Sequence, residues 1–120
     1  MLKIVFAVIV AIHGLIHLMG FVKAFQLASI KELTLPISRP MGVIWLITAV
    51  LFVLTLVFFL LNKPWWWMAA APAIILSQIL ILAYWKDAKF GTIANVIILL
   101  PTIVAFGHWS FRAMAQKELT

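Results

Sequence analysis

Residues 4–22 read IVFAVIVAIHGLIHLMGFV and form the first of four apolar runs in the chain. As a helix, this run of about 19 residues rises about 28 Å, close to the thickness of the hydrocarbon core of a bilayer. His13 and His17 lie in its middle third, one helical turn apart. Ionisable side chains at that depth normally face protein or trapped water, so this turn is the first candidate for a functional site.

The composition places the chain among integral membrane proteins. Its 120 residues are 67% hydrophobic and 10% charged, and the mean hydropathy is +1.22, outside the range of soluble domains. The net charge of +6 comes from basic residues that stand singly at the ends of apolar runs. This distribution favours contact with lipid headgroups over binding of nucleic acid. The absence of cysteine excludes disulfides, thiolate metal sites and thiol catalysis.

Three more apolar runs follow, separated by polar or proline-containing connections. The predicted spans are residues 4–22, 41–61, 65–85 and 93–109, and the longest connection is residues 23–40. Residues 24–30 have the mixed polarity of a short interfacial helix, and residues 110–120 read as a frayed polar tail. Pro72 and Pro101 should kink the third and fourth spans. The pattern predicts an all-α integral membrane protein, a four-helix antiparallel transmembrane bundle in which residues 1–120 are one domain and both termini share a side.

Every predicted span has a polar side chain in the same half of the membrane. Counted from the middle of each span, these residues all lie towards the connection of residues 23–40. On the third span, Ser77 and Gln78 fall at this depth together. The predicted polar cluster, which is the candidate binding site, consists of His13, His17, Thr48, Gln78 and Asn95.

The helical faces agree with these depths. His13, His17, Gly20 and Ala24 share one stripe of the first span, and Thr92, Asn95, Thr102 and the neighbourhood of Ala105 form a comparable stripe on the fourth. Small and hydrogen-bonding residues are those with which membrane helices approach one another closely.

Two explanations fit the predicted cluster. In the first, its side chains only hold the helices together, each contributing about 0.5–2 kcal/mol. In the second, they line a small polar pocket that opens on the side of residues 23–40 and 86–91, where it receives a ligand headgroup or relays protons, as histidine is suited to do. Asp87 on that side either forms a local ion pair or closes over the mouth of the pocket.

Metal, haem and catalytic chemistry fit the sequence less well. His13 and His17 have the i, i+4 spacing of a metal chelate, yet the spans offer no carboxylate or thiolate as a further zinc ligand. A six-coordinate haem needs histidines on facing helices. His13 and His108 lie at different depths of their predicted spans, which makes them a strained pair of ligands. The acidic residues are Glu32, Asp87 and Glu118, all outside the spans. We therefore expect no catalysis by the chain itself.

Two stretches resemble a known group of proteins. Residues 14–23, GLIHLMGFVK, and residues 85–95, WKDAKFGTIAN, resemble small four-span bacterial membrane proteins of the DoxX-like kind, and the membrane segment of an uncharacterised bacterial family. The resemblance implies a bacterial inner-membrane protein. Because some DoxX relatives are associated with quinone-linked sulfur oxidation or oxidative-stress complexes, it also implies a subunit role near membrane redox enzymes.

Two hypotheses of function follow. The first is a small membrane subunit or scaffold, without a cofactor, that associates through its helices with a membrane protein partner or with a second copy of itself. The alternative is a binding module for a lipophilic ligand, a quinone or a haem, in the predicted polar cluster.

The four-span topology can be tested by cysteine labelling. Because an even number of spans returns the chain to its starting side, Lys3→Cys and Lys117→Cys should react with an impermeant maleimide from the same side of sealed vesicles. Lys31→Cys, in the connection of residues 23–40, should react from the opposite side and serves as the control. Labelling of the two terminal positions from opposite sides would contradict the topology.

Overall fold

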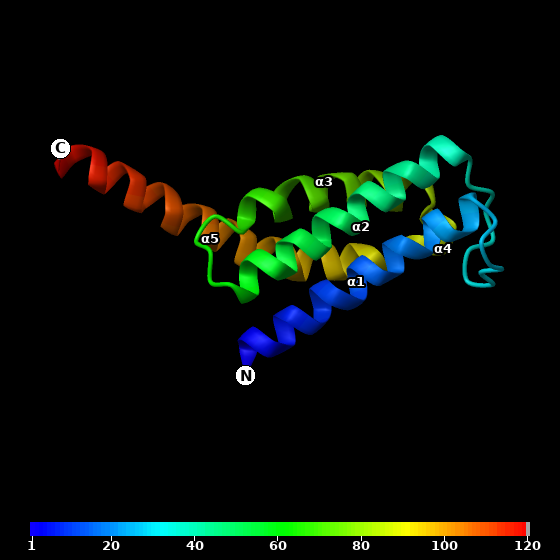
Figure 1. Cartoon of the computed structure of the whole chain (residues 1–120), viewed down its shortest axis with the longest axis horizontal. Helices are drawn as coiled ribbons and strands as arrows, with labels where there is room; N and C mark the ends of the chain where they lie inside the picture. Colours follow the sequence, from blue (N-terminus) through cyan, green and yellow to red (C-terminus); the bar gives the residue numbers. More distant parts are fainter. Residues whose placement is uncertain (120) are drawn as a thin grey trace.

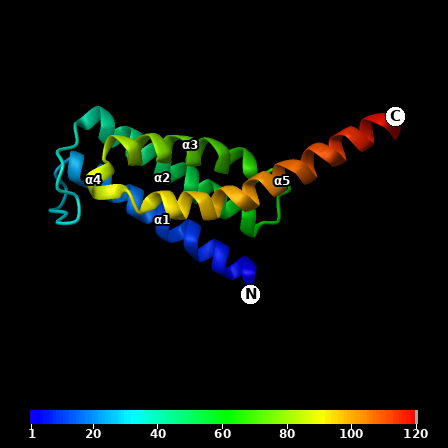
Figure 2. The same ribbon diagram turned by 180° about the vertical axis from the view of Figure 1, so that it is seen from behind.

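The computed structural model describes residues 1–119, and its elements are helices. They are α1 (Leu2–Ala24), α2 (Arg39–Leu60), α3 (Trp67–Ala83), the short α4 (Trp85–Ala88) and α5 (Gly91–Leu119). Contacts join α1 to α2, α2 to α3, α3 to α5 and α5 to α1, so the four long helices enclose a common interior. Figures 1 and 2 show α4 and the connection between α1 and α2 at one end of this bundle, and the N-terminus towards the other.

The all-α prediction is confirmed for the described residues, and three helices are long and apolar enough to cross a membrane. These are α1, α2 and α5. The predicted third span, residues 65–85, is divided instead: Trp65 and Trp66 lie in turns, α3 has 17 residues, and a turn at Tyr84 separates it from α4.

The interfacial helix predicted for residues 24–30 is wrong, because α1 ends in a tight backbone motif. Gln26 has a left-handed φ of 56°. Its amide donates to the Lys23 carbonyl at 3.1 Å, and the Leu27 amide donates to the Val22 carbonyl at 3.0 Å. This pair of bonds is a Schellman motif, which satisfies the last carbonyls of the helix and turns the chain away from its axis.

The frayed tail predicted for residues 110–120 is also wrong over the part that the structure describes. Helix α5 continues to Leu119, and residues 111–119 are exposed. They contain no proline or glycine and are rich in strong helix formers, including Arg112, Met114 and Lys117. Pro101 lies inside α5, and Figures 1 and 2 show that this helix changes direction along its length.

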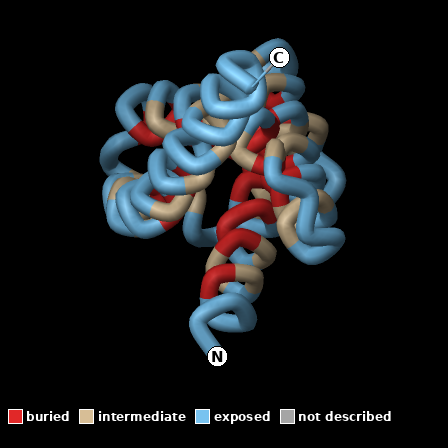
Figure 3. The backbone as a smooth tube through the Cα atoms, turned by 90° about the vertical axis from the view of Figure 1, so that its left-hand side faces the viewer, coloured by how far each residue is buried: buried red, intermediate tan, exposed pale blue. Residues whose placement is uncertain are grey.

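The interior has two apolar clusters with a polar layer between them. One contains Phe6, Val10, Phe52, Trp66, Ala70, Ala73, Ile74 and Ile98. The other contains Ala24, Ile37, Trp45, Leu80 and Tyr84. Along α1 the two histidines fall between the clusters, and Ser77 does so along α3. Figure 3 shows the buried positions in red where the helices face one another, with both ends of the chain exposed.

Close contact between α1 and α2 depends on two glycines. A Cβ atom at Gly20 would lie 2.1 Å from Cδ2 of Trp45, and one at Gly42 would lie 2.3 Å from Cβ of Ala24. Neither distance allows a methyl group. The predicted stripe of His13, His17, Gly20 and Ala24 is therefore a buried contact face, with the glycine providing room for the indole.

Adding a methyl group at Gly20 should destabilise the bundle. We expect Gly20→Ala to lower the free energy of unfolding in micelles by about 1–3 kcal/mol, because the Trp45 indole must move. The control is Gly107→Ala, where a Cβ atom meets nothing within 4 Å, so that the better helix former should be neutral or add up to about 1 kcal/mol. Equal effects of the two substitutions would contradict this packing.

Candidate functional site

Four polar side chains lie in the layer between the two apolar clusters. They are His13 and His17 from α1, Ser77 from α3 and Asn95 from α5, with exposed fractions of 3%, 2%, 0% and 3%. Burying such groups without hydrogen bonds would be costly, so their partners decide whether this arrangement is stable.

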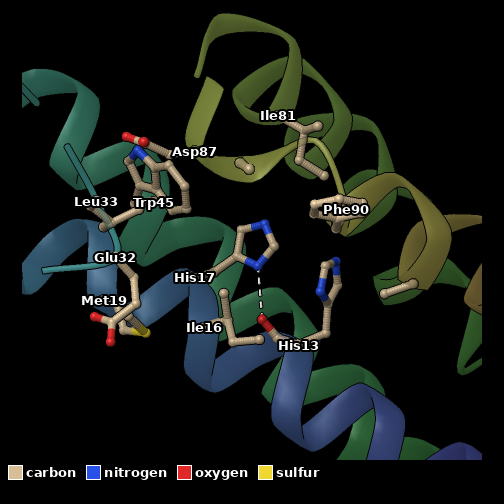
Figure 4. Close-up of a pocket in the computed structure, with 13 residues that line it drawn as sticks. His13, Ile16, His17, Met19, Glu32, Leu33, Trp45, Ile81, Asp87 and Phe90 are labelled. Atoms are coloured by element: carbon tan, nitrogen blue, oxygen red, sulfur yellow. Dashed lines mark hydrogen bonds between the residues drawn. The ribbon is translucent and has the colours of Figure 1, made fainter. Parts of the chain in front are cut away.

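The backbone carbonyl of His13 determines which ring nitrogen of His17 carries the proton. The His13 carbonyl oxygen lies 2.8 Å from Nδ1 of His17 (dashed in Figure 4), and because a carbonyl only accepts, Nδ1 carries the proton. Nε2 of a neutral His17 is then an acceptor, and the Ser77 hydroxyl donates to it at 2.8 Å. Asn95 Nδ2 donates to Ser77 Oγ at 3.0 Å. His13 Nε2 donates to Asn95 Oδ1 at 2.8 Å.

These contacts close on themselves, and we call His13, Asn95, Ser77 and His17 the polar cycle. Each donor of the cycle meets an acceptor, and the arrangement is complete with both imidazoles neutral. A branch leaves it through Gln78, whose Oε1 accepts from Asn95 Nδ2 at 3.1 Å. Gln78 Nε2 then donates to Thr92 Oγ1 at 3.2 Å.

The structure brings together four of the five predicted cluster residues, His13, His17, Gln78 and Asn95. Thr48 is fully buried but is not hydrogen-bonded to these residues: its hydroxyl donates to the Ile44 carbonyl of its own helix at 2.8 Å. Threonine can satisfy its hydroxyl in this way in any helix, so depth and face do not predict its partner. Ser77, absent from the predicted cluster, bonds to both His17 and Asn95, and its depth beside Gln78 was the available signal.

A cavity of about 290 Å³ adjoins the polar cycle. His13 and His17 form its floor, and Trp45, Ile81 and Phe90 are among its walls (Figure 4). Its lining also includes Glu32, Leu33, Asp87, Ala88 and Gly91, which lie on the side predicted for the opening of a pocket.

Two charged side chains hold the connection between α1 and α2 at the mouth of this cavity. The Asp87 carboxylate accepts hydrogen bonds from the amides of Thr34 and Leu35, both at 2.8 Å, and from the Thr34 hydroxyl at 2.6 Å. Lys23 Nζ donates to the carbonyls of Leu33 and Leu35. Of the two roles predicted for Asp87, the structure favours the one at the cavity mouth.

The hydrogen bonds to Asp87 affect its protonation. The Thr34 hydroxyl lowers the pKa of the Asp87 carboxyl below its ordinary value of 3.8, and the Leu35 amide lowers it further. The bonds favour the ionised form, so their contribution to stability is complete above the ordinary pKa and is lost as the pH falls through the lowered one. At neutral pH the tie between Asp87 and the connection is therefore intact.

Haem iron needs a free imidazole nitrogen. Nε2 of His13 and Nε2 of His17 already take part in the polar cycle, and His17 Nδ1 bonds to the His13 carbonyl, which leaves Nδ1 of His13 as the ring nitrogen of this pair without a bond. His108 is exposed, on a part of α5 remote from the cavity lining. Within residues 1–119, no group of three or more histidine, aspartate or glutamate side chains is placed to hold a metal ion.

Comparison with known proteins does not identify the chain: no family model, no curated protein and no solved structure matches it. The function must therefore be inferred from the geometry of the site.

Removing the Ser77 hydroxyl should expose how strongly the polar cycle holds the helices. Ser77→Ala leaves His17 Nε2 without its donor and Asn95 Nδ2 without one acceptor, so we expect a loss of about 1–2 kcal/mol in the free energy of unfolding in micelles. Thr102→Val is the control, because that hydroxyl bonds only to the Ile98 carbonyl of its own helix. A loss no greater than that of the control would show that the cycle contributes little.

Proposed function

We propose that the protein is a four-span integral membrane protein that binds a lipophilic small molecule in the cavity beside the polar cycle. The three long apolar helices support the membrane location. Helix α3 rises about 26 Å over its 17 residues, and Trp65, Trp66 and Trp67 would anchor its start at the interface. This topology places both termini on the same side, and the DoxX-like resemblance favours the inner membrane of a bacterium.

The observation that carries the binding proposal is the position of the cavity relative to lipid. Its inner surface has buried histidines, whereas Ile16 and Phe90 in its lining are 48% and 73% exposed. Figure 4 shows Ile16 and Phe90 on opposite sides of the space in front of the histidines. In a bilayer their exposed faces would meet hydrocarbon, so a molecule dissolved in the membrane could enter sideways between α1 and α5.

The polar cycle supports binding by fixing the floor of the cavity. His17 is held through both of its ring nitrogens and His13 through Nε2. Side chains held in this way lose little further freedom when a ligand binds, which favours affinity. The apolar walls would take the body of the ligand, and a quinone is one member of this class.

A second candidate, the membrane subunit or scaffold, is favoured by the end of α5. Residues 111–119 are exposed on all sides and extend beyond the bundle in Figure 2. Phe111 and Met114 are among the exposed apolar side chains there. A membrane protein partner or a second copy of the chain would cover them. This role is compatible with ligand binding at the other end of the bundle.

Filling the cavity should remove the ligand. We expect an extract of the protein, purified in its native lipid within polymer nanodiscs, to contain a small molecule at near one equivalent by mass spectrometry. Ala94→Phe, which adds a ring to the cavity lining, should abolish this retention while the protein remains folded. Val96→Phe is the control, because Val96 is half exposed and outside the lining.

Equal lipid-soluble contents in both variants and the wild type would contradict binding in the cavity. If a stoichiometric protein copurifies instead of a small molecule, the subunit role would be favoured.

A further inference from the structure

We propose that the ligand of this cavity is a lipophilic cation, an amphiphile whose headgroup is a protonated amine. This inference rests on the proposed function and specifies the chemical class of the molecule that binds. Two observations support it: the charges of the side chains that line the cavity, and the hydrogen-bonding capacity that this lining leaves unused.

The charges at the cavity are opposite to those of the chain as a whole. The chain has nine lysines and arginines against three acidic residues. Two of those three, Glu32 and Asp87, line the cavity, and none of the basic residues does. Lys23 lies near Asp87, but its Nζ is bound to the carbonyls of Leu33 and Leu35. The charged side chains of the lining therefore favour a positive headgroup over an anionic one.

The hydrogen-bonding capacity left on the floor of the cavity is that of an acceptor. The ring N–H groups of His13 and His17 both donate within the protein, to Asn95 and to the His13 carbonyl. The atom that remains is Nδ1 of His13, a lone-pair acceptor in this tautomer. A quinone, whose carbonyls only accept, finds no free ring N–H on this floor.

One donor in the lining lacks a partner among the described residues, the indole N–H of Trp45. It is buried, and Figure 4 draws its nitrogen on the edge of the ring turned away from His17. It is thus covered by protein rather than presented at the floor of the cavity. The faces of the aromatic walls are already in contact with other groups: Trp45 packs against His17 with ring centroids 5.4 Å apart, and Nζ of Lys89 lies 5.4 Å from the centroid of the Phe90 ring.

The two carboxylates have different parts in this site. Asp87 accepts three hydrogen bonds from Thr34 and Leu35, so it holds the mouth in shape while adding negative charge. Glu32 is exposed, and its carboxylate makes no hydrogen bond or ion pair to any residue that the structure describes. Glu32 is therefore the group free to pair with an ammonium headgroup, with the alkyl part of the ligand lying between Ile16 and Ile81.

The test uses three probes with the same chain length and different headgroups. Radiolabelled decylammonium, decanol and decanoate are equilibrated at pH 7 with the protein in nanodiscs of zwitterionic lipid, and binding to empty nanodiscs is subtracted. We expect decylammonium to bind most tightly and decanoate most weakly. Glu32→Gln should weaken decylammonium binding by at least about threefold, as expected for an exposed ion pair, and should leave decanol unchanged. Glu118→Gln, which removes the one acid remote from the cavity, is the matched control.

The outcomes separate this inference from the proposed function. If decanol binds as tightly as decylammonium, or if Glu32→Gln and Glu118→Gln behave alike, the cation preference is wrong. Should decanol binding then still be lost in Ala94→Phe, the cavity remains a lipophilic site of another specificity. If none of the three probes binds above empty nanodiscs, the cation proposal and the binding role of the cavity both fail.

Discussion

Two imidazoles in the middle of an apolar helix impose the constraint on which the rest of this structure depends. An apolar environment offers them no hydrogen bonds, so every partner must come from the protein. The polar cycle meets that demand with one serine and one asparagine from two other helices and one backbone carbonyl. Because each bond has a defined direction, the cycle specifies the rotation of α1, α3 and α5 about their axes as well as their separation.

The apolar layers on either side of the cycle then determine how closely the helices approach. Gly20 lets the Trp45 indole lie against α1, and that ring contacts His17 with centroids 5.4 Å apart. The Phe52 ring contacts both histidines as well, with centroids 4.9 Å from His13 and 5.3 Å from His17. Helix α2 thus packs aromatic rings against the histidines, whereas α3 and α5 provide their hydrogen-bond partners.

The sequence predicts the site best where a side chain has few ways to satisfy its hydrogen bonds. Histidine, glutamine and asparagine in a span need partners, so depth and helical face alone are enough to group His13, His17, Gln78 and Asn95. The same reasoning does not predict the partner of Thr48, because its hydroxyl bonds to its own helix. The Schellman motif at Gln26 is not predictable either, since glutamine rarely adopts a left-handed φ and only the bonds of the turn select it. The helical tail shows that charge alone does not end a helix.

The large separation in sequence between the partners of the polar cycle has a consequence for biosynthesis. His17 and Ser77 are 60 residues apart, and His13 and Asn95 are 82 apart. At a synthesis rate of about 5–20 residues per second, the first helix would wait on the order of 4–16 s for its last partner to emerge from the ribosome. In the membrane-spanning chain that we propose, its imidazoles must be solvated during that interval by the insertion machinery or by lipid headgroups. A chain interrupted after α2 would keep two polar side chains exposed to the bilayer, a feature by which membrane quality control could recognise it.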